Sequence, residues 1–308
     1  IMNLLAHEYF HLWNVKRIRP IELGPFNYDQ ECYTSLLWVM EGITSYYDEL
    51  LLRRAGFYTK EEFLSKMQSQ INYVEGSPGS RVQPVAHASF DAWIKAYRPN
   101  ENSSNTTMTY YSRGAVLGAV LDAYLIQKSN KKRSLDGFMQ LLYNKYALEL
   151  KRGFTEAEFE QELSTYCGED MHAFFANYVN GTQIIPYQKY LEPMGLTVKD
   201  VTSSQTSIGA TFDGNEVVKV KAVRRGSAAE EAGLSVGDEV LICNGYRINK
   251  DMLEGMLNSL SSGESMMLTV ARDEKVFQVK FIMKNYTKPQ FSIQIKDANA
   301  PLLTYWLR

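Results

Sequence analysis

The sequence has little cysteine and no excess of positive charge. Its 308 residues include only three cysteines, Cys32, Cys167 and Cys243, which lie far apart and form no Cys-x-x-Cys pair. We therefore expect buried free thiols and no disulfide framework. The 33 Lys and Arg residues are balanced by 35 Asp and Glu residues, which gives a net charge of −2. This balance excludes the basic field that attracts nucleic acids or anionic membranes, so we expect no nucleic-acid partner.

Long apolar runs are missing as well. No stretch of the sequence approaches the ~18 apolar residues that a membrane-spanning helix needs, so no membrane span is expected. The composition is otherwise that of an ordinary globular protein, with 45% hydrophobic and 22% charged residues. The length is enough for about two domains with a sizeable core.

Histidine is rare, with four residues in the chain, yet two of them stand close together near its start. The stretch reads His7-Glu8-Tyr9-Phe10-His11 and lies in a run without Gly or Pro that predicts a helix. Residues four positions apart share one helix face, so both imidazoles can bind the same Zn²⁺ ion. Glu8 can then act as a base toward a water molecule at that ion. The alternative is a helix that carries these side chains for packing or solubility.

A second helical run, over residues 33–55, contains a glutamate between apolar residues. We expect Glu41 to be buried or to line a cleft, where a carboxylate needs a partner or a metal. It follows His11 by thirty residues, which is enough for the chain to return as an antiparallel helix. Glu41 is therefore the expected third zinc ligand, and a core glutamate paired with an arginine is the alternative. Asp48 or Glu49 can orient a ligand histidine from the same helix.

A later helix, from about residue 109 to 125, opens with two tyrosines. A tyrosine at such a position can point into a cleft and donate a hydrogen bond to a carbonyl oxygen that becomes an oxyanion. Adjacent tyrosines are also common in cores and interfaces. Further helices are expected over residues 59–74, 89–96, 134–147, 155–166 and 170–179. His87 and His172 are expected to be structural or surface residues.

Beyond about residue 195 the pattern changes from helical spacing to short alternating runs. This part contains Gly-Ser-Ala-Ala at 226–229, Ala-Gly-Leu at 232–234, Gly-Asp-Glu-Val-Leu at 237–241 and Asn-Gly at 244–245. The series resembles PDZ domains of bacterial proteases, which bind an extended peptide as an added strand and hold its terminal carboxylate with backbone amides. Ser207, Ile208, Gly209 and Ala210 form the candidate carboxylate-binding loop. The alternative is a PDZ fold that only packs against another domain.

The motifs of the helical part resemble those of gluzincin metallopeptidases, specifically the glycyl aminopeptidase family that carries a PDZ domain. The resemblance rests on residues 7–20, 38–44 and 110–115 and extends over nearly the whole chain. It implies a multidomain α+β fold, with a mainly α-helical thermolysin-like catalytic domain over residues 1–185 and a small β-rich PDZ domain over residues 195–284. Residues 285–308 are expected to pack on a domain or a partner chain.

The resemblance also implies a function. We expect a zinc metallopeptidase in which His7, His11 and Glu41 bind one Zn²⁺, Glu8 is the base and Tyr111 stabilises the oxyanion, with Tyr110 as the alternative donor. The implied activity is an aminopeptidase that removes N-terminal Gly or Ala from peptides or proteins. The alternatives are a zinc endopeptidase guided by its PDZ domain, or a catalytically silent fragment whose PDZ domain binds peptide C-termini.

The start of the chain also differs from the family pattern. The sequence begins with Ile1, already inside the metal helix, whereas the family has a β-rich domain ahead of that helix. We interpret the chain as a fragment whose N-terminal part, with any targeting signal, is absent. The compartment, periplasm or cytoplasm, and the oligomeric state stay open.

Overall fold

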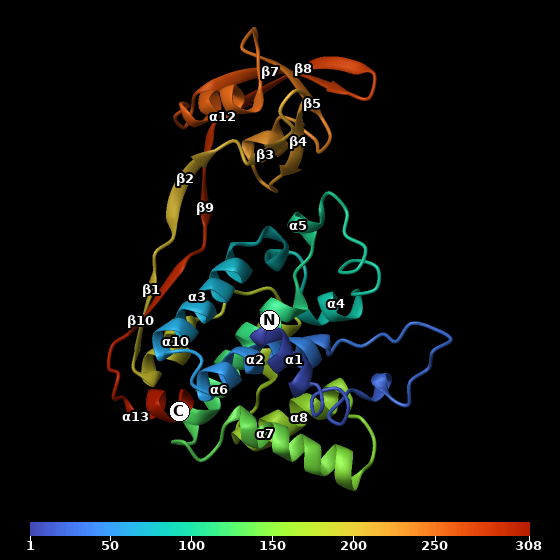
Figure 1. Ribbon diagram of the computed structural model, residues 1–308, viewed down its shortest axis with the longest axis vertical. Helices are drawn as coiled ribbons and strands as arrows, with labels where there is room; N and C mark the ends of the chain where they lie inside the picture. Colours follow the sequence, from blue (N-terminus) through green and yellow to red (C-terminus); the bar gives the residue numbers. More distant parts are fainter. The chain divides into compact units, whose positions relative to one another are not determined.

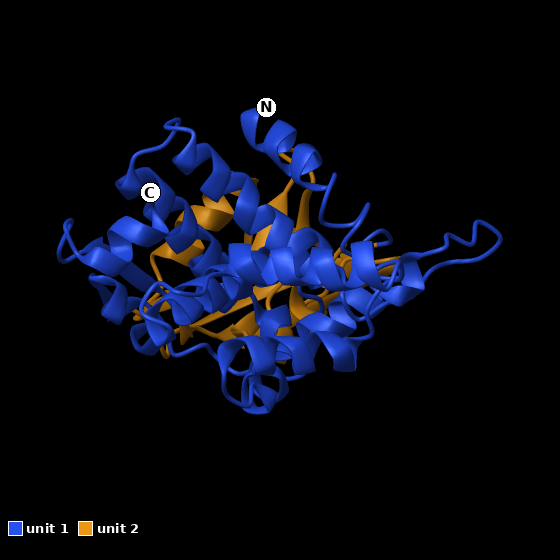
Figure 2. Cartoon of the chain, turned by 90° about the horizontal axis from the view of Figure 1, so that it is seen from below, with its two compact units in different colours: residues 1–98, 107–201, 290–308 blue, residues 99–106, 202–289 orange.

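The computed structural model describes residues 1–308 and divides into two compact units (Figure 2). Unit 1 contains residues 1–98, 107–201 and 290–308, and unit 2 contains residues 99–106 and 202–289. Each unit is thus assembled from segments that are separated along the chain. None of the helices has both the length and the apolar composition that crossing a membrane requires.

Unit 1 is mainly helical (Figure 1). Its helical segments are α1 (Met2–Phe10), η1 (Ile21–Leu23), η2 (Trp38–Gly42), α2 (Ile43–Arg54), α3 (Lys60–Gly76), η3 (Pro78–Arg81), α4 (Val85–Phe90), α6 (Tyr110–Lys128), α7 (Leu135–Leu142), η4 (Tyr143–Glu149), α8 (Glu156–Cys167), α9 (His172–Phe174), η5 (Phe175–Val179), α10 (Tyr187–Leu191), η6 (Glu192–Met194) and α13 (Pro301–Trp306). Its two strands, β1 (Leu196–Asp200) and β10 (Phe291–Ile295), pair antiparallel.

Local sequence signals explain several helix starts. Capping boxes begin α3 at Thr59 and α8 at Thr155, each with a glutamate three residues later that bonds back to the cap. The helix expected over residues 89–96 is instead α4, which begins at Val85 and ends at Phe90, and turns follow it. Its N-cap residue is Pro84, whose backbone is extended and whose missing N–H costs no helical hydrogen bond at that position.

The core of unit 1 surrounds α6, which is buried over most of its length. Two glycines allow α6 to touch η2 without a gap. A Cβ atom added at Gly114 would lie 2.5 Å from the carbonyl oxygen of Trp38, and one added at Gly42 would lie 2.4 Å from the Cα of Gly114. Because no side chain separates the two helices, the first turn of α6 lies beside Glu41.

A buried carboxylate connects three helices of the same core. Glu75 on α3 accepts from Arg113 Nη1 of α6 at 2.9 Å and from the Tyr187 hydroxyl of α10 at 2.5 Å. Its side chain has no exposed surface, and that of Arg113 is 4% exposed. A charge this deep is tolerated because it is paired and hydrogen-bonded.

The last segment of the chain completes unit 1. The Trp306 side chain of α13 is fully buried, and its indole N–H donates to the hydroxyl of Tyr46 at 2.8 Å. Tyr46 in turn donates to Asp122 Oδ2 at 2.5 Å, and the Phe63 ring packs edge-on against Trp306. The C-terminal helix thus belongs to the core that supports α2 and α6.

Unit 2 is rich in strands, so the expected α+β fold class is confirmed. Its strands are β2 (Ser203–Ser207), β3 (Ala210–Asp213), β4 (Val218–Val223), β5 (Glu239–Cys243), β6 (Tyr246–Arg247), β7 (Ser265–Arg272), β8 (Lys275–Ile282) and β9 (Lys284–Lys288), and its helices are α5 (Ser103–Thr106), α11 (Ala228–Glu231) and α12 (Lys250–Asn258). The main sheet has the order β3-β4-β5-β7-β8, with β6 paired to β5, while β2 and β9 form a separate ladder. Strand β3 therefore lies at a sheet edge.

The segment 99–106 is fixed to unit 2 by one side chain. The Asn105 amide donates to the carbonyl of Val223 at 2.7 Å, and its oxygen accepts from the backbone N–H of Arg225 at 2.9 Å. One asparagine thus satisfies a backbone donor and a backbone acceptor just after β4.

Replacing Trp306 tests how much unit 1 depends on its C-terminal helix. Trp306→Ala should lower the free energy of unfolding by about 3–5 kcal/mol, because it removes a fully buried indole. Urea denaturation followed by circular dichroism measures this change. The control is Tyr28→Ala, at a side chain that is 91% exposed, where the cost should stay below about 1 kcal/mol. Equal stabilities of the two variants would contradict the assignment of Trp306 to the core.

Candidate metal centre

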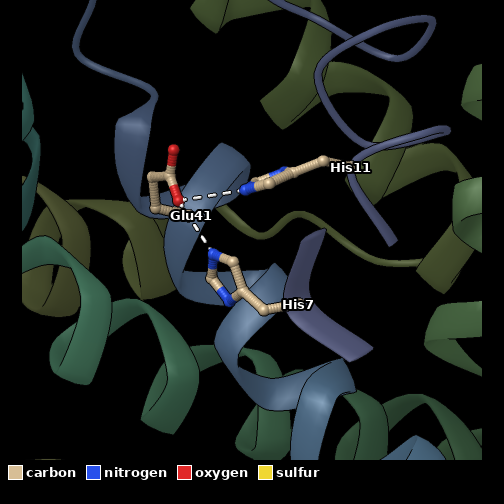
Figure 3. Close-up of side chains that lie close together, drawn as sticks. All are labelled: His7, His11 and Glu41. Atoms are coloured by element: carbon tan, nitrogen blue, oxygen red, sulfur yellow. Dashed lines mark hydrogen bonds and ion pairs between the residues drawn. The ribbon is translucent and has the colours of Figure 1, made fainter. Parts of the chain in front are cut away.

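His7 of α1, His11 directly after the end of α1 and Glu41 of η2 meet at one point (Figure 3). The Nε2 atoms of His7 and His11 lie 3.2 and 3.3 Å from the same carboxylate oxygen, Oε2 of Glu41. One ligand atom from each of the three residues lies within 4.8 Å of the other two. This set of two imidazoles and a carboxylate matches the His₂Glu ligands of catalytic zinc sites. The structure thus brings together the three predicted residues, whose role as ligands stays a prediction.

Helix packing produces this convergence. Helix α1 runs antiparallel to α2, since His11 meets Glu41 at one end and Asn3 bonds to Glu49 at the other. Glu41 itself lies in η2, a π-helical turn that directly precedes α2. Such turns are rare and frequently occur at functional sites.

The Nδ1 atom of each imidazole ring interacts with a residue outside the cluster. His7 Nδ1 lies 3.1 Å from Asp48 Oδ2, and His11 Nδ1 donates to the backbone oxygen of Asn14 at 2.8 Å. Metal-binding histidines usually donate their other N–H to a carboxylate or a carbonyl, which fixes the tautomer and the ring orientation. The surroundings of both rings therefore suit metal binding.

Electrostatics couple these side chains strongly. The hydrogen bond to Asp48, and then that to Glu41, raise the pKa of His7 to about 9 against the effect of burial. Burial opposes ionisation of Glu41, but its bonds to His11 and His7 outweigh burial and lower the pKa of Glu41 to about 2. At neutral pH, His7 thus holds a proton that a divalent cation would displace.

Asn14 connects His11 to the turn that carries Glu41, a role that the sequence did not indicate. Its buried amide nitrogen lies 2.9 Å from the carbonyl oxygen of Val39, 3.0 Å from that of Met40 and 3.0 Å from Thr44 Oγ1. Its own backbone oxygen holds the His11 ring. A polar residue inside an otherwise apolar run was the only signal available in the sequence.

The predicted oxyanion donor lies beside the cluster, whereas the predicted base adjoins the cluster in the sequence. Glu8 follows His7 on α1, is exposed and forms no ion pair or hydrogen bond. The Tyr111 ring stacks on the His7 ring at a centroid distance of 6.2 Å. Burial, together with the Glu41 charge, raises the pKa of Tyr111, so its hydroxyl stays a hydrogen-bond donor. Of the two adjacent tyrosines, Tyr110 is buried behind Tyr111, with ring centroids 4.8 Å apart.

The other two histidines take no part in the cluster. His87 is exposed on α4, and His172 is exposed and lies 3.1 Å from Glu160 Oε1. Both locations agree with the expectation of structural or surface residues.

The candidate carboxylate-binding loop connects β2 to β3 in unit 2. Its backbone carbonyls are partly used, since Ile208 accepts from Ala229 and Gly209 accepts from Arg224. The amide of Gly209 donates to the Ser207 hydroxyl at 3.0 Å. Gly209 has a φ of +77°, and an added Cβ would lie 2.2 Å from Ser227, so glycine is required there.

Two protein families match separate parts of the chain. The M61 glycyl aminopeptidase family matches residues 1–117, and the PDZ domain family matches residues 193–282. A crystal structure of an aminopeptidase N family protein from Idiomarina loihiensis is 25% identical, with a TM-score of 0.85, over 100% of this chain and 54% of that chain. The chain therefore spans about half the length of that protein.

Two solved PDZ domains are also similar to part of the chain. One is the PDZ domain of HtrA3 bound to a phage-derived ligand, which is 16% identical over 28% of this chain and 92% of that chain, with a TM-score of 0.25. The other is the PDZ domain of a carboxy-terminal protease from Vibrio cholerae in complex with a peptide, 16% identical over 27% of this chain and 98% of that chain, with a TM-score of 0.24. No curated protein matches significantly. Residues 1–117 thus match the M61 glycyl aminopeptidase family and residues 193–282 match the PDZ domain family, the two families that the sequence resembles.

Proposed function

We propose that the protein is a zinc-dependent aminopeptidase that removes small N-terminal residues, Gly or Ala, from peptides. The observation that carries this proposal is the convergence of His7, His11 and Glu41, whose ligand atoms lie within 4.8 Å of one another. The outward nitrogens of both rings are already bound, by Asp48 and by the backbone of Asn14, so the inward nitrogens remain for an ion. The match to the glycyl aminopeptidase family supports the choice of reaction and substrate.

Each residue has a separate role in this proposal. His7, His11 and Glu41 would hold Zn²⁺, which polarises the scissile carbonyl and makes water a nucleophile at neutral pH. Glu8 takes the proton from the attacking water and delivers it to the leaving amine. Tyr111, kept protonated by burial and by the Glu41 charge, donates to the oxygen that becomes negatively charged.

The PDZ domain adds a proposed peptide site. Strand β3 pairs with β4 on one side only, so its other edge is free to accept a peptide as an added strand. We assign the terminal carboxylate of such a peptide to the loop of residues 207–210. This edge also supports the alternative of an endopeptidase that recruits its substrate through the PDZ domain.

Metal content tests the site directly. The purified full-length protein should contain about one zinc per chain, as expected for a catalytic His₂Glu site, and His7→Ala should lose it. The control is His172→Ala, which changes an exposed histidine away from the cluster and should leave zinc unchanged. Atomic absorption measures both. Full zinc content in His7→Ala would contradict the assigned ligand.

Substitution of Glu8 separates chemistry from metal binding. Glu8→Gln keeps the size of the side chain but removes the base, so kcat should fall by about 10²–10⁴-fold. Zinc content should not change. Glu61→Gln, at an exposed glutamate on α3, is the matched control and should keep full activity. Normal turnover in Glu8→Gln would overturn the mechanism.

A panel of peptides with free and acetylated N-termini separates the two peptidase classes. An aminopeptidase needs the free amine and should cleave only the free series, one residue from the N-terminus. Equal cleavage of acetylated peptides at internal bonds would instead support the endopeptidase.

Asp48 should set the zinc affinity through His7. Asp48→Asn removes the charge that orients and polarises the ring, and the zinc dissociation constant should rise by about 10–100-fold. Competition with a chelator measures this constant. Asp251→Asn, at an exposed aspartate of α12, should have no effect. Unchanged affinity in Asp48→Asn would show that Asp48 does not support the site.

A further inference from the structure

A stripe of large apolar side chains on unit 1 faces solvent, and the metal-centre proposal gives it no role. Phe90, Trp93, Ile94 and Tyr97 follow one another at the spacing of a single helix face, through the end of α4 and the turns that follow. Their exposed fractions are 49%, 49%, 62% and 67%. The opposite side of the segment is buried, with Ala92 only 2% exposed. Such an apolar stripe usually packs on a partner. We refer to it as the 90–97 stripe.

Neighbouring residues fix two of these rings in place. The indole N–H of Trp93 donates to the backbone oxygen of Cys32 at 3.3 Å, and the Phe90 ring lies 5.2 Å from the Tyr33 ring. The stripe is therefore a formed surface whose two anchors are already oriented.

A row of phenols connects the stripe to the metal cluster. The hydroxyl of Tyr97 lies 3.4 Å from that of Tyr110, whose ring stacks on Tyr111 at 4.8 Å. Tyr111 in turn stacks on the His7 ring at 6.2 Å. The stripe therefore begins beside the residue that would contact the scissile carbonyl.

We propose that the 90–97 stripe binds the apolar side chains of a peptide substrate on the C-terminal side of the scissile bond. This inference rests on the proposed peptidase function and adds a second determinant of substrate class. Tyr97, at the near end of the stripe, is joined to Tyr111 through Tyr110, so an extended peptide, which advances about 3.3 Å per residue, runs toward the stripe after the scissile bond. Exposed aromatic rings offer them a large contact area with few rotatable bonds.

The stripe determines which peptides are preferred after the N-terminal residue. Leu or Phe at the second and third positions gains contact with Trp93 and Ile94, whereas Ser or Gly does not. The N-terminal residue itself is unaffected, because it lies on the other side of the scissile bond.

The test compares two peptides with the same N-terminal glycine, Gly-Leu-Phe and Gly-Ser-Gly, on the zinc-loaded full-length protein. The native protein should cleave Gly-Leu-Phe with a kcat/KM about tenfold higher, as expected for one good aromatic contact. Trp93→Ala should reduce this ratio to near one by lowering kcat/KM for Gly-Leu-Phe alone. Trp93→Phe should keep most of the preference. Phe57→Ala, at a ring that is 60% exposed elsewhere on unit 1, should leave both rates unchanged.

A binding measurement on the zinc-free protein makes the result independent of catalysis. In calorimetry, Gly-Leu-Phe should bind more tightly than Gly-Ser-Gly, and Trp93→Ala should remove the difference. Failure of the native protein to cleave any peptide would overturn the proposed function. The calorimetric difference would still show whether the 90–97 stripe binds apolar peptide side chains. Cleavage or binding without a preference, or a preference that survives in Trp93→Ala, would overturn the stripe. So would a large fall in melting temperature of Trp93→Ala without loss of preference, since the stripe would then be a packing face of the full-length protein.

Discussion

The geometry of the cluster of His7, His11 and Glu41 depends on the hydrogen bonds of one buried residue, Asn14. The fully buried Asn14 amide lies 2.9 Å from the carbonyl oxygen of Val39 and 3.0 Å from that of Met40, both in the π-helical turn η2. Burying its N–H groups without an acceptor would cost on the order of 1–3 kcal/mol each. The backbone oxygen of Asn14 also accepts a hydrogen bond from the His11 ring. Asn14 therefore stabilises the turn that carries Glu41 and also orients His11.

The same cluster concentrates charge in a partly buried place. Glu41 is kept ionised by two imidazoles, with its pKa lowered to about 2, and His7 is kept protonated by Asp48 and Glu41, with its pKa raised to about 9. The proton on His7 thus compensates the negative charge of Asp48 and Glu41, and a divalent cation in its place would compensate the same charge. Burial, and after it the negative charge of Glu41, raises the pKa of the adjacent Tyr111, which explains why its hydroxyl resists ionisation.

The sequence predicted the parts of this structure that follow from local pattern. The spacing of His7 and His11 indicated one helix face, the capping boxes at Thr59 and Thr155 marked helix starts, and the change of period near residue 195 marked the β-rich part. The π-turn at Glu41 and the contacts of Asn14 could not be predicted, because they depend on how α1, η2 and α6 pack. The joining of residues 99–106 to unit 2 could not be predicted either, since the spacing of hydrophobic residues carries no information on which distant segments meet.

The discontinuous make-up of unit 1 has a consequence for how the protein is made. A ribosome finishes residues 202–289, nearly all of unit 2, before it adds β10 and the helix that carries Trp306. Until then the cavity that Trp306 fills beside Tyr46 and Phe63 stays open on the nascent chain. Of the two units, unit 1 is thus the first to be started and the last to be completed during translation. Until it is completed, its exposed core is a site where chaperones would bind or aggregation would start.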